Sequence, residues 1–177
     1  MSKAIVSSFR VFLVAGAVLL CALALGCQQQ LADATMVGQA AKSVMINVAE
    51  IYNTGNVELV GAVISPQYLG HFSPLEEPVI GRKGFTEWVL VNRAAYSDLR
   101  VNINEMVAEN NMICVKWTVT GTHTGKLFDI EPTGNWVRVE GLTMARLEGG
   151  KIIEEWIIWD VLDFYGQLGV EMTPGQI

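Results

Sequence analysis

The sequence predicts an α+β domain, with helices in its first part and an antiparallel sheet in its second. Two observations lead to this prediction. From residue 37 to residue 96 the apolar residues recur at helical spacing, with one irregular stretch between them. From Leu99 onward apolar and polar residues alternate with a period of two, which is the period of a strand.

Three helices are expected before the strands. The first follows the apolar stripe from Val37 to Ile51 and ends at Gly55, because glycine suits the position just past a last helical turn. Asn56 can cap a short second helix, which ends before Pro66. Residues 67–80 show no period and are interpreted as a loop. A third helix then starts at residues 81–84 and has an apolar face made of Phe85, Trp88, Val89 and Tyr96.

Strand periodicity begins at Leu99 and continues to the end of the last predicted strand, Ile152 to Val161. Asn110-Asn111 and residues 148–151 have the composition of tight hairpin turns. The apolar positions of the alternating pattern are Val101, Ile103, Ile113, Val115, Trp117, Val119, Val137, Val139 and Leu147.

The first 26 residues have the features of a targeting segment. Lys3 and Arg10 form a positively charged region before an apolar run from Val11 to Leu25, and Gly26 and Cys27 follow the run. This arrangement is similar to a bacterial lipoprotein signal, in which the cysteine is acylated and becomes the first mature residue. Two alternatives stay open: ordinary cleavage with release, and an uncleaved anchor, although the run is shorter than the ~20 residues that span a bilayer. We expect an extracytoplasmic protein, periplasmic or on the cell surface, held at a membrane by Cys27.

The expected organisation is a signal over residues 1–26, a tether over residues 27–36 and one domain over residues 37–177. Loss of the signal moves the formal charge from −6 to −8, because Lys3 and Arg10 leave with it. An acidic chain without a basic cluster argues against nucleic acid as a partner, because neutralising phosphates requires Lys and Arg on one face. Cys114 would be the remaining thiol, so no intrachain disulfide is expected.

Several short motifs occur in a fixed order along the chain: Gly81-Arg82-Lys83-Gly84-Phe85, Gly121-Thr122-His123-Thr124-Gly125, Pro132-Thr133-Gly134, Gly149 to Trp156, Asp160 and Gln167-Leu168-Gly169. Together, over residues 40–170, they resemble the SnoaL-like polyketide cyclase (ester cyclase) family of the nuclear-transport-factor-two-like superfamily. The resemblance implies a cone-shaped, curved antiparallel sheet with three N-terminal helices that enclose one apolar cavity for a hydrophobic small molecule. It also implies a homodimer through the outer face of the sheet.

The resemblance assigns a catalytic carboxylate to the last strand, where Asp160 is at the matching position. In the family this aspartate acts as general acid and base in an intramolecular aldol closure, without metal or cofactor. Simple alternation puts Asp160 on one face with Trp156 and Ile158, where burial would raise the pKa of its carboxyl. The alternative is that Asp160 caps the turn that follows it.

His123 is the second catalytic candidate, as a residue that orients Asp160 or binds the substrate carbonyl. The alternative is a hairpin end, because two glycines flank the Thr-His-Thr sequence. Six residues are candidates for binding the substrate, by their apolar or aromatic character or by family position: Trp156, Trp117, Ile158, Met144, His71 and Arg146.

Two functions are therefore compared. The first is an enzyme of the cyclase or isomerase kind that uses Asp160 with support from His123. The second is a lipid-anchored binding or assembly module that holds a hydrophobic ligand in the same cavity without turnover. The two histidines are far apart and the cysteines are not clustered, so no metal site is expected.

Overall fold

The computed structural model describes residue 36 and residues 38–170. The predicted signal and Cys27 lie outside the described residues. Within the described part of the chain, no helix is both long and apolar enough to cross a membrane.

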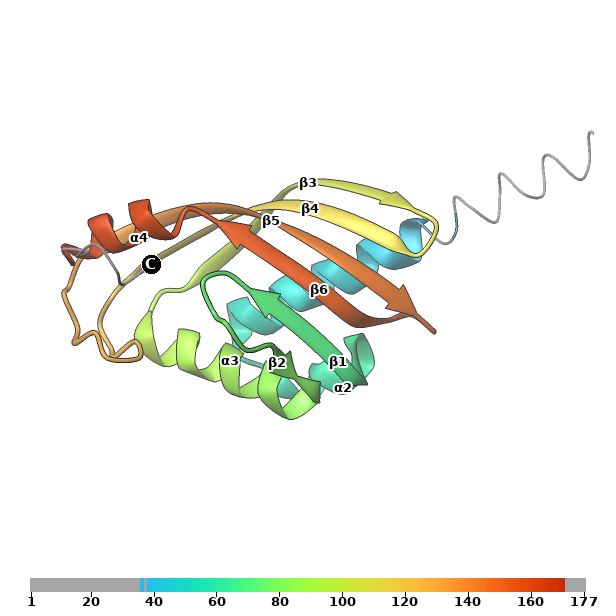
Figure 1. Ribbon diagram of the computed structural model, residues 1–177, viewed down its shortest axis with the longest axis horizontal. Helices are drawn as coiled ribbons and strands as arrows, with labels where there is room; N and C mark the ends of the chain where they lie inside the picture. Colours follow the sequence, from blue (N-terminus) through green and yellow to red (C-terminus); the bar gives the residue numbers. More distant parts are fainter. Residues whose placement is uncertain (1–35, 37, 171–177) are drawn as a thin grey trace, which may run out of the picture. The chain divides into compact units, whose positions relative to one another are not determined.

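The structure confirms the α+β class: helices pack on one curved, unclosed six-stranded sheet (Figure 1). The N-terminal helix covers residues 38–54. The strands are hydrogen-bonded in the order β2-β1-β6-β5-β4-β3. In chain order the remaining elements are η1 (Val57–Leu59), α2 (Val60–Val63), β1 (Ile64–Phe72), β2 (Val79–Ile80), α3 (Gly81–Ala95), β3 (Arg100–Glu109), β4 (Met112–Thr122), β5 (Trp136–Glu148), β6 (Lys151–Trp159) and α4 (Val161–Leu168).

The N-terminal helix ends where the sequence predicts. Gly55 adopts a φ of 74°, a left-handed conformation that glycine reaches without steric cost. Arg93 of α3 donates hydrogen bonds to the carbonyls of Tyr52 and Asn53, which the end of the helix leaves without partners. Asn56 then accepts a hydrogen bond from the Glu58 amide and caps η1.

The interpretation of residues 67–80 as a loop is wrong. Most of this segment belongs to β1 and β2, and β1 pairs in parallel with β6, so the sheet is not antiparallel throughout. The pairing shifts register between Ile64 and Leu69. Because of this irregularity, burial along β1 does not follow a period of two, and the sequence carries no strand signal there.

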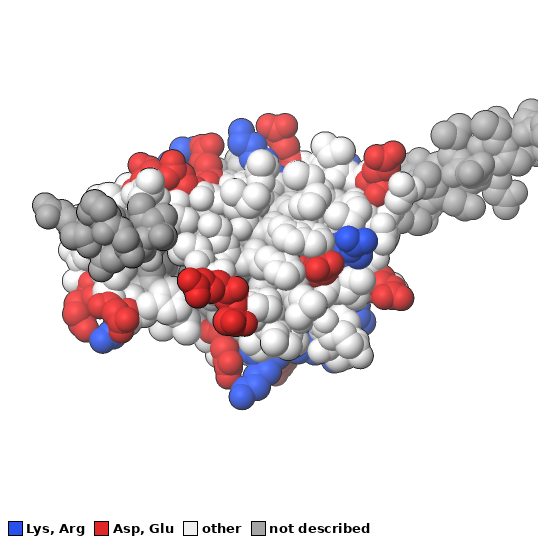
Figure 2. Space-filling view, in the orientation of Figure 1, with Lys and Arg blue, Asp and Glu red and all other residues white. Residues whose placement is uncertain are grey.

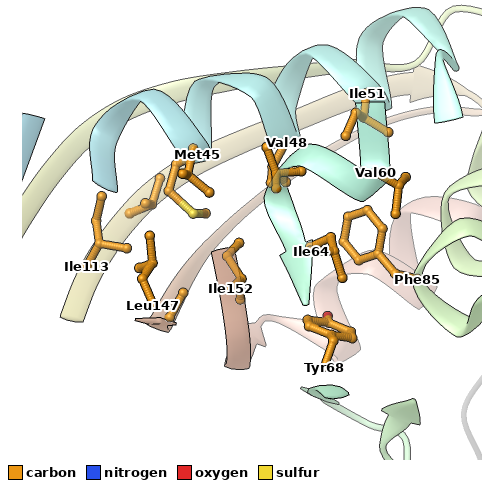
Figure 3. Close-up of a cluster of buried hydrophobic side chains, with 14 of the residues drawn as sticks. Met45, Val48, Ile51, Val60, Ile64, Tyr68, Phe85, Ile113, Leu147 and Ile152 are labelled. Atoms are coloured by element: carbon orange, nitrogen blue, oxygen red, sulfur yellow. The ribbon is translucent and has the colours of Figure 1, made fainter. Parts of the chain in front are cut away.

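The helices cover one face of the sheet and form its main core. Figure 3 shows Met45, Val48 and Ile51 of the N-terminal helix on the side that faces Ile113 and Ile152 of the strands. All five are at most 8% exposed. Burial of side chains of this size contributes about 1.5–3 kcal/mol each, which fixes the helix on the sheet.

A second cluster of buried residues lies where α4 meets β5. Tyr96, Leu99, Val137, Phe164 and Leu168 belong to it. Charged side chains of both signs lie mainly around the edge of the face shown in Figure 2, and the described residues form no extended basic patch in that view.

Candidate active site

A cavity of about 370 Å³ lies between the covered face of the sheet and the helices. Aliphatic and aromatic side chains make up most of its wall. Among the described residues that line it, Glu155 is the one acidic residue, and none is Lys, Arg or His. The cavity is therefore an apolar site with one carboxyl group in its wall.

Glu155 reaches the cavity from β6, with Ile157 and Trp159 on the same face of that strand. Its neighbours across the sheet are Gly70 on β1 and Ala145 on β5. The side chain is 2% exposed. Burial raises the pKa of the Glu155 carboxyl from 4.5 to about 7, although a hydrogen bond from Tyr68 opposes this shift. At neutral pH the group is thus divided between its protonated and ionised forms.

Tyr68 of β1 donates a hydrogen bond from its hydroxyl to Oε1 of Glu155. Gly70 makes this contact possible, because a Cβ at that position would overlap the Tyr68 hydroxyl. Burial also raises the pKa of Tyr68, so its hydroxyl keeps the proton and acts as a donor. Among the described residues, the other oxygen of Glu155, Oε2, has no hydrogen-bond partner.

Tyr52 brings a second phenol to the same end of the cavity. The Phe85 ring lies between the two tyrosines, with ring centroids 6.0 Å from Tyr52 and 5.6 Å from Tyr68, both edge-on. Burial first, and then the charge of Glu155, raise the pKa of Tyr52. Its protonated hydroxyl can therefore donate to an oxygen of a bound molecule.

Asp160 does not line the cavity. It is exposed and caps α4, with Oδ1 accepting a hydrogen bond from the Asp163 amide at 2.9 Å. This is the capping alternative that the sequence left open.

The structure also corrects the face assigned to Trp156 and Ile158. Both are on the outer face of β6, and Ile158 is 68% exposed. The cause is a shift in the pairing of β6 with β5, where Leu147 pairs with Ile152 but Arg146 pairs with Glu154. The extra residue, Ile153, reverses the alternation, so that Ile152 and Glu155 both point inward.

Three other substrate-binding candidates are also outside the cavity lining, on the outer face: His71, Met144 and Arg146. The His71 ring stacks on Trp156 with centroids 5.6 Å apart, and its Nε2 is 3.2 Å from Oε1 of Glu154. Nε of Arg146 is 3.5 Å from Oε2 of the same carboxylate. Glu154 therefore joins these residues into a surface cluster.

Trp117 is the predicted binding residue that does line the cavity. Its indole N–H donates to Oγ1 of Thr143 at 2.9 Å. The ring lies directly over Gly141, where any Cβ would overlap it. The absence of a side chain at residue 141 thus sets the position of the indole in the cavity wall.

His123 is fully buried but is not part of the cavity lining. Its Nδ1 accepts a hydrogen bond from the Thr133 amide at 3.2 Å, and its backbone bonds to Asn135 and Gly134. Burial lowers the pKa of the imidazole, which favours the neutral ring. The contacts of His123 hold the ends of the loop between β4 and β5 together, which is the hairpin-end alternative.

Tyr52, Tyr68 and Glu155 are not among the residues that the sequence patterns point to as functional. Under simple alternation Glu155 has the opposite parity to Asp160, so the pattern places it on the face opposite the expected catalytic residue. Tyr68 was in the segment interpreted as a loop. The one available signal was an acidic residue inside an otherwise apolar strand, from Ile152 to Trp159, which is unusual unless the residue has a function.

Solved structures of low sequence identity share this fold. A SnoaL-like protein from Jannaschia sp. CCS1 is 17% identical, covers 77% of this chain and 96% of its own, and has a TM-score of 0.70. A candidate polyketide cyclase from Acidithiobacillus ferrooxidans is 28% identical, with 73% and 94% covered and a TM-score of 0.66. IdmH from Streptomyces antibioticus is 24% identical, with 73% and 99% covered and a TM-score of 0.63.

No curated protein matches the sequence at a significant level. The sequence profile described as SnoaL-like polyketide cyclase matches residues 42–168, from the N-terminal helix to the end of α4. Since this match covers most of the chain, the protein belongs to the SnoaL-like polyketide cyclase family.

Proposed function

We propose that the protein is a cofactor-independent enzyme of the cyclase or isomerase kind, and that Glu155 transfers the proton. The observation that carries this proposal is a buried carboxyl group, in an apolar cavity, with its pKa raised to about 7. A general acid or base works best when its pKa is close to the pH of operation. Glu155 therefore takes the role that the family resemblance gave to Asp160.

In the proposed reaction, Glu155 takes one proton from the substrate and returns it to the product. The Glu155 carboxylate removes a proton from a carbon next to a carbonyl, and the enolate carbon attacks a second carbonyl carbon of the same molecule. A carbon–carbon bond forms, and the carboxyl returns its proton to the new alkoxide. Protonated phenols can stabilise the developing oxygen charge, and Tyr52, which lines the cavity, would supply one.

The substrate proposed is a hydrophobic small molecule with at least one carbonyl group. The cavity is within the range of about 300–1,000 Å³ that is usual for small-molecule sites. Trp88, Trp117 and Trp159 contribute broad apolar surfaces to its wall, which suit a flat ring system.

The alternative is a binding module without turnover. One observation favours it: Asp160, the residue at the family's catalytic position, is used as a helix cap. The cavity would then hold the same class of ligand, and Glu155 would hydrogen-bond it without moving a proton.

A proton-exchange experiment separates the two functions. The purified protein is mixed with 2-tetralone in D₂O, and exchange of the protons next to the carbonyl is followed by ¹H NMR. We expect exchange above the buffer rate with the natural protein, and loss of this excess in Glu155→Gln. Glu154→Gln is the matched control, because it changes the adjacent residue on the outer face. Binding without exchange in the natural protein would support the module, and exchange that survives in Glu155→Gln would exclude the assigned role.

We also propose a homodimer through the outer face of the sheet, as the family resemblance implies. Leu142, Met144 and Ile158 are about half exposed or more on that face. Ile158→Lys should convert the dimer to a monomer, which light scattering would detect as a halved molar mass. A natural protein that is already monomeric would contradict the proposal.

A further inference from the structure

Glu155 is a buried acid without a basic partner among the described residues. The ion pairs of this part of the chain use other acids, at the surface, such as Glu87, Glu131 and Glu140. The cavity lining contains no Lys, Arg or His. A buried carboxylate is stable only with a counter-charge or a proton, and the tyrosine that bonds to its Oε1 supplies neither.

Aromatic rings form part of the cavity wall on the elements that flank Glu155. Ile157, the next inward residue of β6, pairs with Phe72 on β1 and Thr143 on β5. The Phe72 ring contacts Trp88, with centroids 4.9 Å apart, and Trp117 hydrogen-bonds to Thr143. Each of these aromatic residues lines the cavity, as does Tyr52.

We infer that the cavity binds an organic ammonium ion, with the Glu155 carboxylate as its counter-ion and these aromatic rings around its alkyl groups. An ammonium group supplies the positive charge that the described wall lacks. The faces of Trp, Tyr and Phe rings attract such a cation, most strongly where water is excluded. Oε2 of Glu155 has no hydrogen-bond partner among the described residues, so it is available to contact the ammonium group.

The inference goes beyond the proposed reaction, because it concerns the charge of the ligand and needs no turnover. The ionisable groups that face Glu155 are the phenols of Tyr68 on β1 and Tyr52 on the N-terminal helix. Both keep their protons near neutral pH, since burial raises both pKa values. From β5 and α3, no ionisable side chain among the described residues lines the cavity. The charge in the cavity wall at neutral pH is therefore that of Glu155.

The test compares phenyltrimethylammonium with tert-butylbenzene, which has the same shape without the charge. Binding to the purified protein is measured by calorimetry at pH 8.5 and pH 5.5. We expect the cation to bind at least tenfold more tightly than its isostere at pH 8.5. Its affinity should fall roughly thirty-fold at pH 5.5, as Glu155 takes up a proton.

Two variants complete the test. Glu155→Gln should lose the preference for the cation and its pH dependence while it still binds the isostere, which shows that the cavity is intact. Glu154→Gln should behave like the natural protein. Equal or tighter binding of the isostere, an unchanged preference in Glu155→Gln, or no binding of the cation would each overturn the inference. None of these results affects the exchange experiment with 2-tetralone, so failure of the inference is distinct from failure of the proposed enzyme.

Discussion

The Tyr68 hydroxyl donates a hydrogen bond to Oε1 of Glu155, although the two residues are 87 positions apart in the sequence. The parallel pairing of β1 with β6 brings them together, and Gly70 leaves the space that the phenol occupies. The contact partly offsets the desolvation of the carboxyl, because the hydrogen bond favours its ionised form. It thereby keeps the pKa of Glu155 in the range useful for proton transfer.

The first prediction concerns this hydrogen bond. Tyr68→Phe should raise the pKa of Glu155 above about 7, since burial would then act without the opposing hydrogen bond. Gly70→Ala should do the same by displacing the phenol. Carbon-detected NMR titration of the carboxyl measures the shift. Tyr96→Phe is the control, because Tyr96 lines the same cavity but its buried hydroxyl has no hydrogen-bond partner among the described residues. An unchanged titration in Tyr68→Phe would show that the contact does not set the pKa.

The second prediction is a pH dependence of stability. The carboxyl of Glu155 has a higher pKa in the folded state, about 7, than its ordinary value of 4.5. Between these values the folded protein binds more protons than the unfolded chain, so the free energy of unfolding decreases as the pH rises. The total loss should be about 3 kcal/mol.

Urea unfolding at pH 5 and pH 8 measures this dependence. Glu155→Gln should be less sensitive to the change of pH than the natural protein by about that amount, because its amide does not ionise. Glu154→Gln should keep the natural dependence. An equal pH dependence of the free energy of unfolding in all three proteins would mean that ionisation of Glu155 does not destabilise the folded state.

The third prediction distinguishes two roles of Asp160, as the N-cap of α4 and as the catalytic residue. Asp160→Ala should lower the free energy of unfolding by about 1 kcal/mol, as expected for loss of a helix N-cap. Asp160→Asn can still accept the hydrogen bond from the Asp163 amide and should lose less. Both variants should keep proton exchange with 2-tetralone. Loss of exchange in a stable, folded Asp160→Asn would instead return the catalytic role to Asp160.

The fourth prediction concerns His123. Its pKa is lower in the folded state than in the unfolded chain, because burial disfavours the charged ring. The unfolded chain therefore takes up a proton first, so the His123 contribution to stability is present above about pH 6.5 and is lost as the pH falls below it. His123→Asn should unfold more easily at pH 8 but lose less stability than the natural protein between pH 7 and pH 5. A parallel decline in the two proteins, followed by urea unfolding, would contradict this.

The fifth prediction tests the membrane anchor. Cys27→Ser removes the thiol that would be acylated, and the protein should move from the membrane fraction to the soluble fraction of the cells that produce it. Mass spectrometry of the natural protein should find a lipid-modified cysteine at its N-terminus. Retention of Cys27→Ser in the membrane fraction would contradict a lipoprotein signal.

Local sequence patterns were sufficient to predict the class of fold, most element boundaries and the family. These depend on local periodicity and on short motifs, such as the glycine at residue 55 and the turn at 148–151, whose conformations are set by nearby residues. Asp160 as a cap is also a local property, and the sequence contained it as an alternative.

The set of residues that face the cavity depends on how the strands pair in the folded protein. Alternation divides a strand into two sets but does not say which set points inward, and one extra residue at Ile153 exchanges the sets. The hydrogen bond between Tyr68 and Glu155 likewise requires β1, a strand that the sequence pattern does not reveal and that forms by pairing with β6. The site therefore depends on pairing between distant segments, which local sequence patterns do not encode.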